Sequence, residues 1–110
     1  MIAVIFEVTP RPGRAKAYFD LAAALKPALE RIDGFISVER FESLTTPGKY
    51  VSLSFWRDEE AVEAWYRHAG HRAAQATGKA DIFADFRIRV AKVLRDYTLA
   101  DRTGEGRRRQ

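Results

Sequence analysis

The fold of this chain is indicated most clearly by residues 50–61, with the sequence YVSLSFWRDEEA. The first seven residues alternate, with Val51, Leu53 and Phe55 on one face and tyrosine, serine and tryptophan on the other, which predicts a β-strand. Asp58 then predicts a helix N-cap, because its carboxylate can accept hydrogen bonds from free amides. The two glutamates that follow suit the positive end of the helix dipole. A strand therefore passes directly into a helix here.

The residues just before this strand predict its hairpin partner. Residues 35–44 are rich in strand formers, and Thr46-Pro47-Gly48-Lys49 has the composition of a turn. Two strands joined by a short turn make a β-hairpin. The alternation in the first of them slips between Val38 and Phe41, which predicts a β-bulge.

A helix and a first strand are predicted nearer the N-terminus. Apolar residues recur at the helical period from Tyr18 to Ile32, and Asp33-Gly34 ends the pattern. Pro27 predicts a kink or a restart of the helix, because proline has no N–H for the carbonyl of Ala23. Residues 2–8 alternate and predict a strand, with Glu7 as an acid in an otherwise apolar run.

The residues after 61 predict two helices and one long strand. The helix that starts after Asp58 is expected to break near Ala69-Gly70, and a second short helix is expected over residues 71–77. Alternation from Ile82 to Tyr97 predicts the last strand, with a change of phase near Ala91. The order β-α-β-β-α-β indicates an α+β, ferredoxin-like fold with an antiparallel sheet.

Both faces of the predicted sheet are apolar, although the helices of this fold cover only one face. An apolar sheet face of this size is unfavourable in water. A second copy packed sheet against sheet, with the long last strands crossing between the two, would cover it. The pattern therefore predicts a homodimer.

Composition narrows the class of protein. The 110 residues suit one domain, which we place at residues 1–100, and they include no cysteine for disulfides or thiolate chemistry. No apolar run is long enough for a membrane span, and the N-terminus lacks the features of a signal peptide, so we expect a cytoplasmic protein without membrane partners. Half of the net charge of +4 comes from residues 101–110, which we expect to be a disordered basic tail. The folded part is nearly balanced in charge, which argues against nucleic acid.

Several segments resemble the antibiotic-biosynthesis-monooxygenase domain. They are GFISVERF at residues 34–41, YVSLSFWRDEEA at residues 50–61, and then Trp65, His71, Gln75 and Gly78. The similarity covers about residues 1–100, and it implies a dimeric α/β barrel. The family is functionally mixed, with cofactor-free oxygenases of phenols, quinol oxygenases, haem-degrading enzymes and members without known activity. The fold alone does not choose among these.

Two departures from the family's patterns bear on function. The haem-degrading members have an asparagine on the first strand, where this chain has Glu7. They also have a histidine after the conserved tryptophan, at a position that falls near Gln75 in this chain. Haem would therefore lack its axial ligand. In the cofactor-free oxygenases the resemblance implicates an asparagine, a tryptophan and an arginine around a phenol. This chain has no asparagine, which puts that mechanism in doubt without excluding oxygen chemistry.

The candidate catalytic residues are His71 and Glu7. Histidine carries protons near neutral pH, and a carboxyl group in an apolar strand can have a raised pKa and act as a base. The alternatives are a structural hydrogen bond for His71 and an ion pair to Arg87 or Arg89 for Glu7. A metal site is not expected, because His68 and His71 lack a third ligand and Glu63 is better placed to pair with Arg67.

The candidate substrate-binding residues come from several elements. Trp65 could stack on a flat ligand or belong to the core. Gln75 could bind a ligand oxygen or cap a helix, and Arg40 or Arg87 could stabilise a negative charge. The sequence thus favours a cofactor-independent monooxygenase of small phenolic or quinol-type aromatic substrates. The alternative is a non-catalytic dimeric module that binds a small apolar ligand, with haem binding a more distant third.

Overall fold

The computed structural model describes residues 1–102 and arranges them as one α+β unit. Its elements, in chain order, are β1 (Ile2–Pro10), α1 (Ala15–Glu30), β2 (Phe35–Glu42), β3 (Tyr50–Trp56), α2 (Glu59–Arg67), α3 (Ala69–Thr77), the π-helical turn η1 (Gly78–Ile82), β4 (Phe83–Lys92) and the short α4 (Leu99–Arg102). The four strands form one sheet in the order β2-β3-β1-β4, and every neighbouring pair is antiparallel. The predicted ferredoxin-like fold is confirmed.

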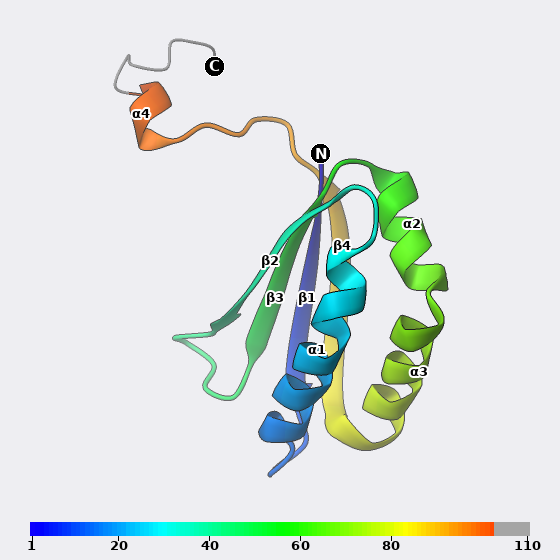
Figure 1. Ribbon diagram of the computed structural model, residues 1–110. Helices are drawn as coiled ribbons and strands as arrows, with labels where there is room; N and C mark the ends of the chain where they lie inside the picture. The colour runs from blue at the N-terminus through cyan, green and yellow to red at the C-terminus, as the bar shows by residue number, and fades with distance from the viewer. Residues whose placement is uncertain (103–110) are drawn as a thin grey trace.

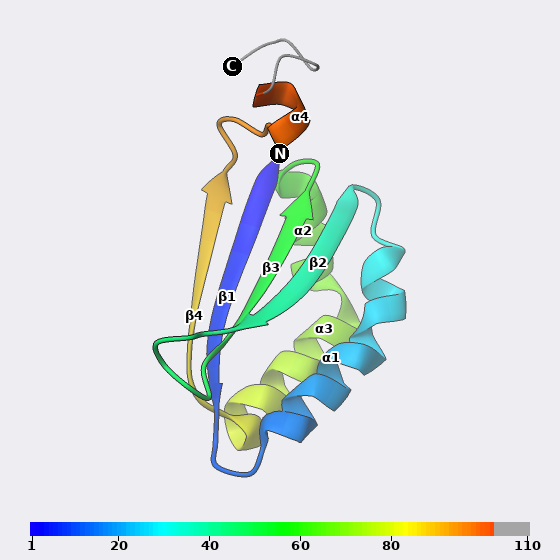
Figure 2. The ribbon, with the colours of Figure 1, turned by 90° about the vertical axis from the view of Figure 1, so that its left-hand side faces the viewer.

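The helices α1, α2 and α3 lie on one face of the sheet (Figures 1 and 2). The register of the central strand decides which side chains face them. Phe6 stands opposite Ser52 of β3 and Ile88 of β4, so these three side chains share the helix-covered face. Their sequence neighbours point to the opposite face, where Ile5 stands opposite Leu53.

The core between sheet and helices has two parts. The first is built from Ile2, Val4, Leu29, Trp56, Ala61, Val62 and Trp65. The second is built from Val8, Tyr18 and Ile82. The two clusters lie along β1, one near each end, and helices that carry apolar stripes cover both.

The uncovered sheet face is apolar at its centre. Ile5, Val51, Leu53 and Phe55 are only half-buried there, and no helix of residues 1–102 packs over them (Figure 2). The expectation of apolar groups on both faces is therefore met, and the face that a barrel partner would cover stays open in the single chain.

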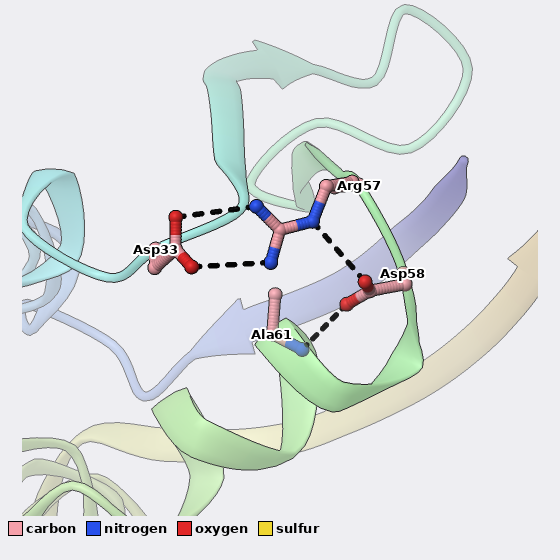
Figure 3. Close-up of polar contacts among 4 residues, drawn as sticks. All are labelled: Asp33, Arg57, Asp58 and Ala61. Carbon is pink, nitrogen blue, oxygen red and sulfur yellow. Dashed lines mark hydrogen bonds and ion pairs between the residues drawn. The ribbon is translucent and has the colours of Figure 1, made fainter.

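A polar junction fixes the start of α2 (Figure 3). The carboxylate of Asp58 accepts a hydrogen bond from the amide of Ala61 at 2.9 Å, which confirms the predicted N-cap. Its second oxygen accepts from Nε of Arg57 at 3.1 Å. The two terminal nitrogens of Arg57 reach the carboxylate of Asp33 at 3.2 and 3.3 Å, so one guanidinium joins the end of β3 to the loop before β2.

The structure corrects the expected restart in α1 and the expected position of the bulge in β2. Helix α1 continues through Pro27 without a restart. Ala23 and Pro27 are both exposed, so water can reach the carbonyl that proline leaves without a donor. The irregularity in the β2–β3 pairing lies between Phe35 and Ser37, nearer the start of β2 than the slipped alternation predicts.

The boundaries after α2 also differ from the expectation. The break between α2 and α3 is at His68, whose backbone is extended and whose ring Nδ1 accepts a hydrogen bond from the amide of Gly70 at 3.0 Å. Strand β4 ends at Lys92 instead of Tyr97, because β1, its neighbour in the sheet, begins at Ile2, opposite Lys92. Just beyond the strand, the amide of Val93 donates a hydrogen bond to the carbonyl of Met1 at 3.0 Å.

The last described residues leave the sheet and end in α4 beyond the N-terminal end of β1 (Figure 1). The expected disordered tail begins at residue 101, but Asp101 lies in this helical turn and accepts a hydrogen bond from the amide of Thr98 at 2.8 Å. Residues 103–110 lie outside the described residues. None of the helices within residues 1–102 has the length and hydropathy of a membrane span.

Candidate functional site

A cavity of about 150 Å³ lies between the sheet and the helices α1, α2 and α3. An apolar cavity of similar size, engineered into another protein, is large enough to hold benzene. Aromatic side chains form much of its wall, namely Phe6, Tyr18, Trp56, Trp65, Tyr66, Phe83 and Phe86. The polar side chains in the lining are Arg40, Ser52, Ser54, His71, Gln75 and Lys79. The cavity therefore suits a body the size of one ring with a few polar contacts.

Both tryptophans of the chain line this cavity. Trp56 is 2% exposed and donates its indole N–H to Oγ of Ser54 at 2.9 Å. Trp65 is 7% exposed and belongs to the same core cluster. Trp65 therefore belongs to the core and also lines the cavity, so its two predicted roles do not exclude each other.

His71 lies in the cavity wall between two aromatic rings. Its ring centroid is 4.8 Å from that of Trp65 and 5.5 Å from that of Tyr66, with the Tyr66 ring nearly parallel to it. Its Nδ1 is buried and has no hydrogen-bond partner within residues 1–102. Burial lowers the pKa of His71 from its ordinary value, a backbone hydrogen bond at Tyr66 opposes this shift, and the nearby His68 adds to it. Burial therefore favours the neutral form of the imidazole, and its Nδ1 atom is enclosed by the surrounding side chains.

Arg40 stands at the rim of the cavity, on the helix-covered face of β2. Its Nε donates to the hydroxyl of Tyr18 at 3.3 Å, and its guanidinium carbon lies 5.7 Å from the centre of the same ring. No ion pair of Arg40 occurs among residues 1–102. One aromatic residue thus orients the guanidinium, and its two terminal nitrogens have no partner in the described part of the chain.

Gln75 and Lys79 approach the cavity from the end of α3. The side-chain amide of Gln75 has no hydrogen bond within the described part of the chain, whereas its backbone carbonyl accepts from the amide of Gly78. The ammonium of Lys79 lies 5.9 Å from the centre of the Phe86 ring. Lys79 was not predicted as a lining residue, because η1, which carries it, has no signal in local periodicity.

Glu7 and Arg87 lie outside this cavity. Glu7 points to the uncovered face of the sheet, where its two oxygens pair with Lys49 at 2.9 Å and with Arg89 at 2.7 Å. The hydrogen bond from Lys49 is the main cause that lowers the pKa of Glu7, the charges of Lys49, Arg89 and Arg87 add to it, and partial desolvation opposes it. The expected raised pKa is wrong, and the ion pair to Arg89 is the alternative that the structure contains.

The remaining polar residues singled out in the sequence have structural partners. Nδ1 of His68 is occupied by the amide of Gly70, and Glu63 pairs with Arg67 at 3.4 Å. Within residues 1–102, no three His, Cys, Asp or Glu side chains are grouped as a metal site would require.

Three residues that line the cavity were not predicted as lining residues, namely Ser52, Ser54 and Tyr66. The two serines could have been found, since the alternation of residues 50–56 already places them on the same face as Trp56.

Fold and site together define a class, a small ferredoxin-like α+β domain with an aromatic cavity between sheet and helices. The sequence model of the antibiotic biosynthesis monooxygenase family matches residues 1–77. The chain belongs to this family, as its resemblance predicts.

Two curated relatives match over much of the chain. The jasmonate monooxygenase ABM of Pyricularia oryzae is 44% identical over 93 residues, which are 84% of this chain and 43% of that protein. The uncharacterised protein YqjZ of Bacillus subtilis is 29% identical over 72 residues, which are 66% of this chain and 61% of that protein. The chain thus spans about half the length of these relatives.

Solved structures confirm the fold. Rv0793 from Mycobacterium tuberculosis is 22% identical, with a TM-score of 0.78 over 88% of this chain and 98% of that one. PA3566 from Pseudomonas aeruginosa is 18% identical, with a TM-score of 0.73 over 86% of this chain and 94% of that one.

Proposed function

We propose that this chain is a cofactor-independent monooxygenase that oxidises small phenolic or quinol-type aromatic substrates in the cavity beside Trp65. The observation that carries the proposal is His71, an imidazole that burial favours in its neutral form in the wall of an aromatic cavity, and whose Nδ1 has no hydrogen-bond partner within residues 1–102. Membership of the monooxygenase family and the name of the 44% identical relative, a jasmonate monooxygenase, support the same class of reaction.

His71 acts as the proton acceptor in this proposal. Removal of the phenolic proton yields an electron-rich phenolate, which can pass an electron to O₂ without a metal or flavin. Recombination places one oxygen atom on the ring. The second oxygen leaves as water with two hydrogens, one from the hydroxyl group and one from the ring carbon that is oxidised. The products are a quinone and one water molecule.

A homodimer is the second part of the proposal. The centre of the uncovered sheet face holds Ile5, Val51, Leu53 and Phe55, and a second sheet would remove these side chains from water. The segment after β4 also carries large exposed apolar side chains, with Leu94 and Leu99 both 79% exposed. It extends beyond the N-terminal end of β1 (Figure 1), where a partner's surface would cover it.

Oxygen consumption tests the enzymatic part. We expect wild-type protein to consume O₂ with some members of a hydroquinone and naphthol panel that also includes jasmonate, and His71→Gln to lower the rate by about a hundredfold or more. The matched control is His68→Asn, which removes the only other imidazole and keeps a residue suited to an N-cap. It should stay within about threefold of wild type. Equal background rates for wild type and His71→Gln across the panel would refute the proposal.

The alternative is a non-catalytic module that binds a small apolar ligand. The mainly aromatic and aliphatic lining of the cavity favours binding as such. Saturable quenching of the two cavity tryptophans by the same panel, without oxygen consumption, would identify this alternative.

A further inference from the structure

The cavity has an unbalanced set of charges. Arg40 and Lys79 both line it, whereas within residues 1–102 no aspartate or glutamate does. Neither cation forms an ion pair with a described residue, and each instead lies over an aromatic ring, Arg40 over Tyr18 and Lys79 over Phe86. A ligand with a negative charge would supply the missing counter-charge.

Arg40 is the better placed of the two for a carboxylate. Tyr18 holds it through Nε and through the face of its ring, so both terminal nitrogens remain as a planar fork. This fork matches the two oxygens of a carboxylate in a bidentate pair. Arg57 already makes a pair of this kind within the protein, since its two terminal nitrogens donate to the two carboxylate oxygens of Asp33 (Figure 3).

Arg40 and His71 contact different parts of the core. Arg40 contacts Tyr18, which belongs to the cluster with Val8 and Ile82. His71 contacts Trp65, which belongs to the cluster with Val4 and Trp56. A ligand that meets both groups must therefore have its anion apart from the atoms that face His71, with an apolar body between them.

We propose that the ligand of this cavity is an amphipathic carboxylate whose ring-sized apolar body fills the aromatic cavity while its carboxylate pairs with Arg40. This inference names the substrate class for the proposed function and rests on it for the reaction, but binding alone tests it. The carboxylate serves as an anchor, and the reacting carbon lies at the His71 side.

A matched ligand pair tests the anchor. The probes are 3-phenylpropanoate and its methyl ester, which differ mainly in charge, and binding is read from the fluorescence of Trp56 and Trp65. We expect wild-type protein to bind the acid at least about tenfold tighter than the ester at low salt. The ratio should fall as ionic strength rises, because the rim of the cavity is open to solvent. Arg40→Gln should bring the ratio to about one and leave affinity for the ester unchanged.

Two further variants serve as controls. Arg72→Gln removes an exposed arginine of α3 that does not line the cavity, and it should keep the wild-type ratio. Lys79→Gln should lower the ratio less than Arg40→Gln. A larger loss with Lys79→Gln would overturn the assignment of Arg40, as would equal binding of acid and ester to wild type. Failure of both probes to bind at millimolar concentration would also overturn it.

The outcomes for binding and catalysis are separable. A charge-selective cavity without oxygen consumption would refute the monooxygenase and uphold the carboxylate anchor. Oxygen consumption that is equal for a phenolic acid and its methyl ester, together with equal binding of the two probes, would uphold the monooxygenase and refute the anchor.

Discussion

Gly34 faces the side chain of Ala61 so closely that a methyl group on Gly34 would lie 2.7 Å from the Ala61 Cβ. The same glycine has a φ of +96° and accepts a hydrogen bond from the amide of Arg57 at 2.7 Å. The loop before β2 is thereby held against the start of α2, the helix that carries Trp65 into the cavity wall.

This contact predicts that Gly34→Ala destabilises the fold by roughly 2–4 kcal/mol, from a left-handed backbone and a steric clash together. The matched control is Gly48→Ala, since Gly48 has a φ of +85° but nothing within 4 Å of the added methyl. It should cost only about 1–2 kcal/mol. Urea denaturation measures both. Equal losses for the two variants would show that the Ala61 contact contributes nothing.

The N-cap of α2 predicts a graded series at Asp58. Asp58→Ala removes the acceptor for the amide of Ala61, and we expect the melting temperature to fall by roughly 5 °C. Asp58→Asn keeps a capping oxygen and should lose less. The hydrogen bond from Ala61, followed by that from Arg57, lowers the pKa of Asp58, so its contribution is present above the ordinary value of 3.8 and is lost as the pH falls through the folded value. A larger loss for asparagine than for alanine would contradict the cap.

The buried His71 predicts that stability falls as the pH drops, as it does for Asp58. At His71, however, protonation adds a charge, whereas at Asp58 it removes one. Burial lowers its pKa below the ordinary value of 6.5, so between the folded value and 6.5 the unfolded chain binds more protons. Stability from the buried neutral ring is complete above about pH 6.5 and falls as the pH drops below it. NMR titration should give a midpoint below 6.5, and His71→Gln should flatten this part of the stability curve. A midpoint above 6.5 would also remove the neutral base from the proposed reaction.

Glu7 should be dispensable for turnover. It lies on the uncovered sheet face, paired with Lys49 and Arg89, so Glu7→Gln is expected to change any oxygen consumption by less than about twofold. Because those cations lower its pKa, the wild-type stability that Glu7 provides is present above the ordinary value of 4.5 and is lost as the pH falls through the folded value. A rate loss comparable to that of His71→Gln would return Glu7 to the catalytic role.

The uncovered sheet face predicts how the proposed homodimer can be broken. Leu53→Glu places a charge at the centre of that face, and we expect the dissociation constant to rise more than about a hundredfold. Light scattering at micromolar concentration should then give a mass near 12.5 kDa, with wild type at twice that value. Ala24→Glu, on the exposed side of α1, should remain dimeric. A monomeric wild type would refute the sheet-to-sheet assembly.

Local patterns predicted most of the secondary structure and some of the site. The hairpin, the faces of residues 50–56 and the Asp58 cap depend on neighbours in sequence, and all three are confirmed. Trp65, His71, Gln75 and Arg40 were selected by residue type or family resemblance, and they line one cavity. The end of β4 could not be predicted, because it depends on where β1 begins.

The amino-acid sequence by itself determined the alternation of the strands, the stripes of the helices and the Asp58 cap of α2, since these arise from interactions within a few residues. Only the tertiary structure decided which face of the sheet the helices cover, because both faces are apolar in sequence. A shift of one residue in a strand reverses the face of every side chain. That single choice places Phe6 in the cavity wall and Glu7 outside it, and it brings Arg40 and His71, which are far apart in the chain, to the same cavity.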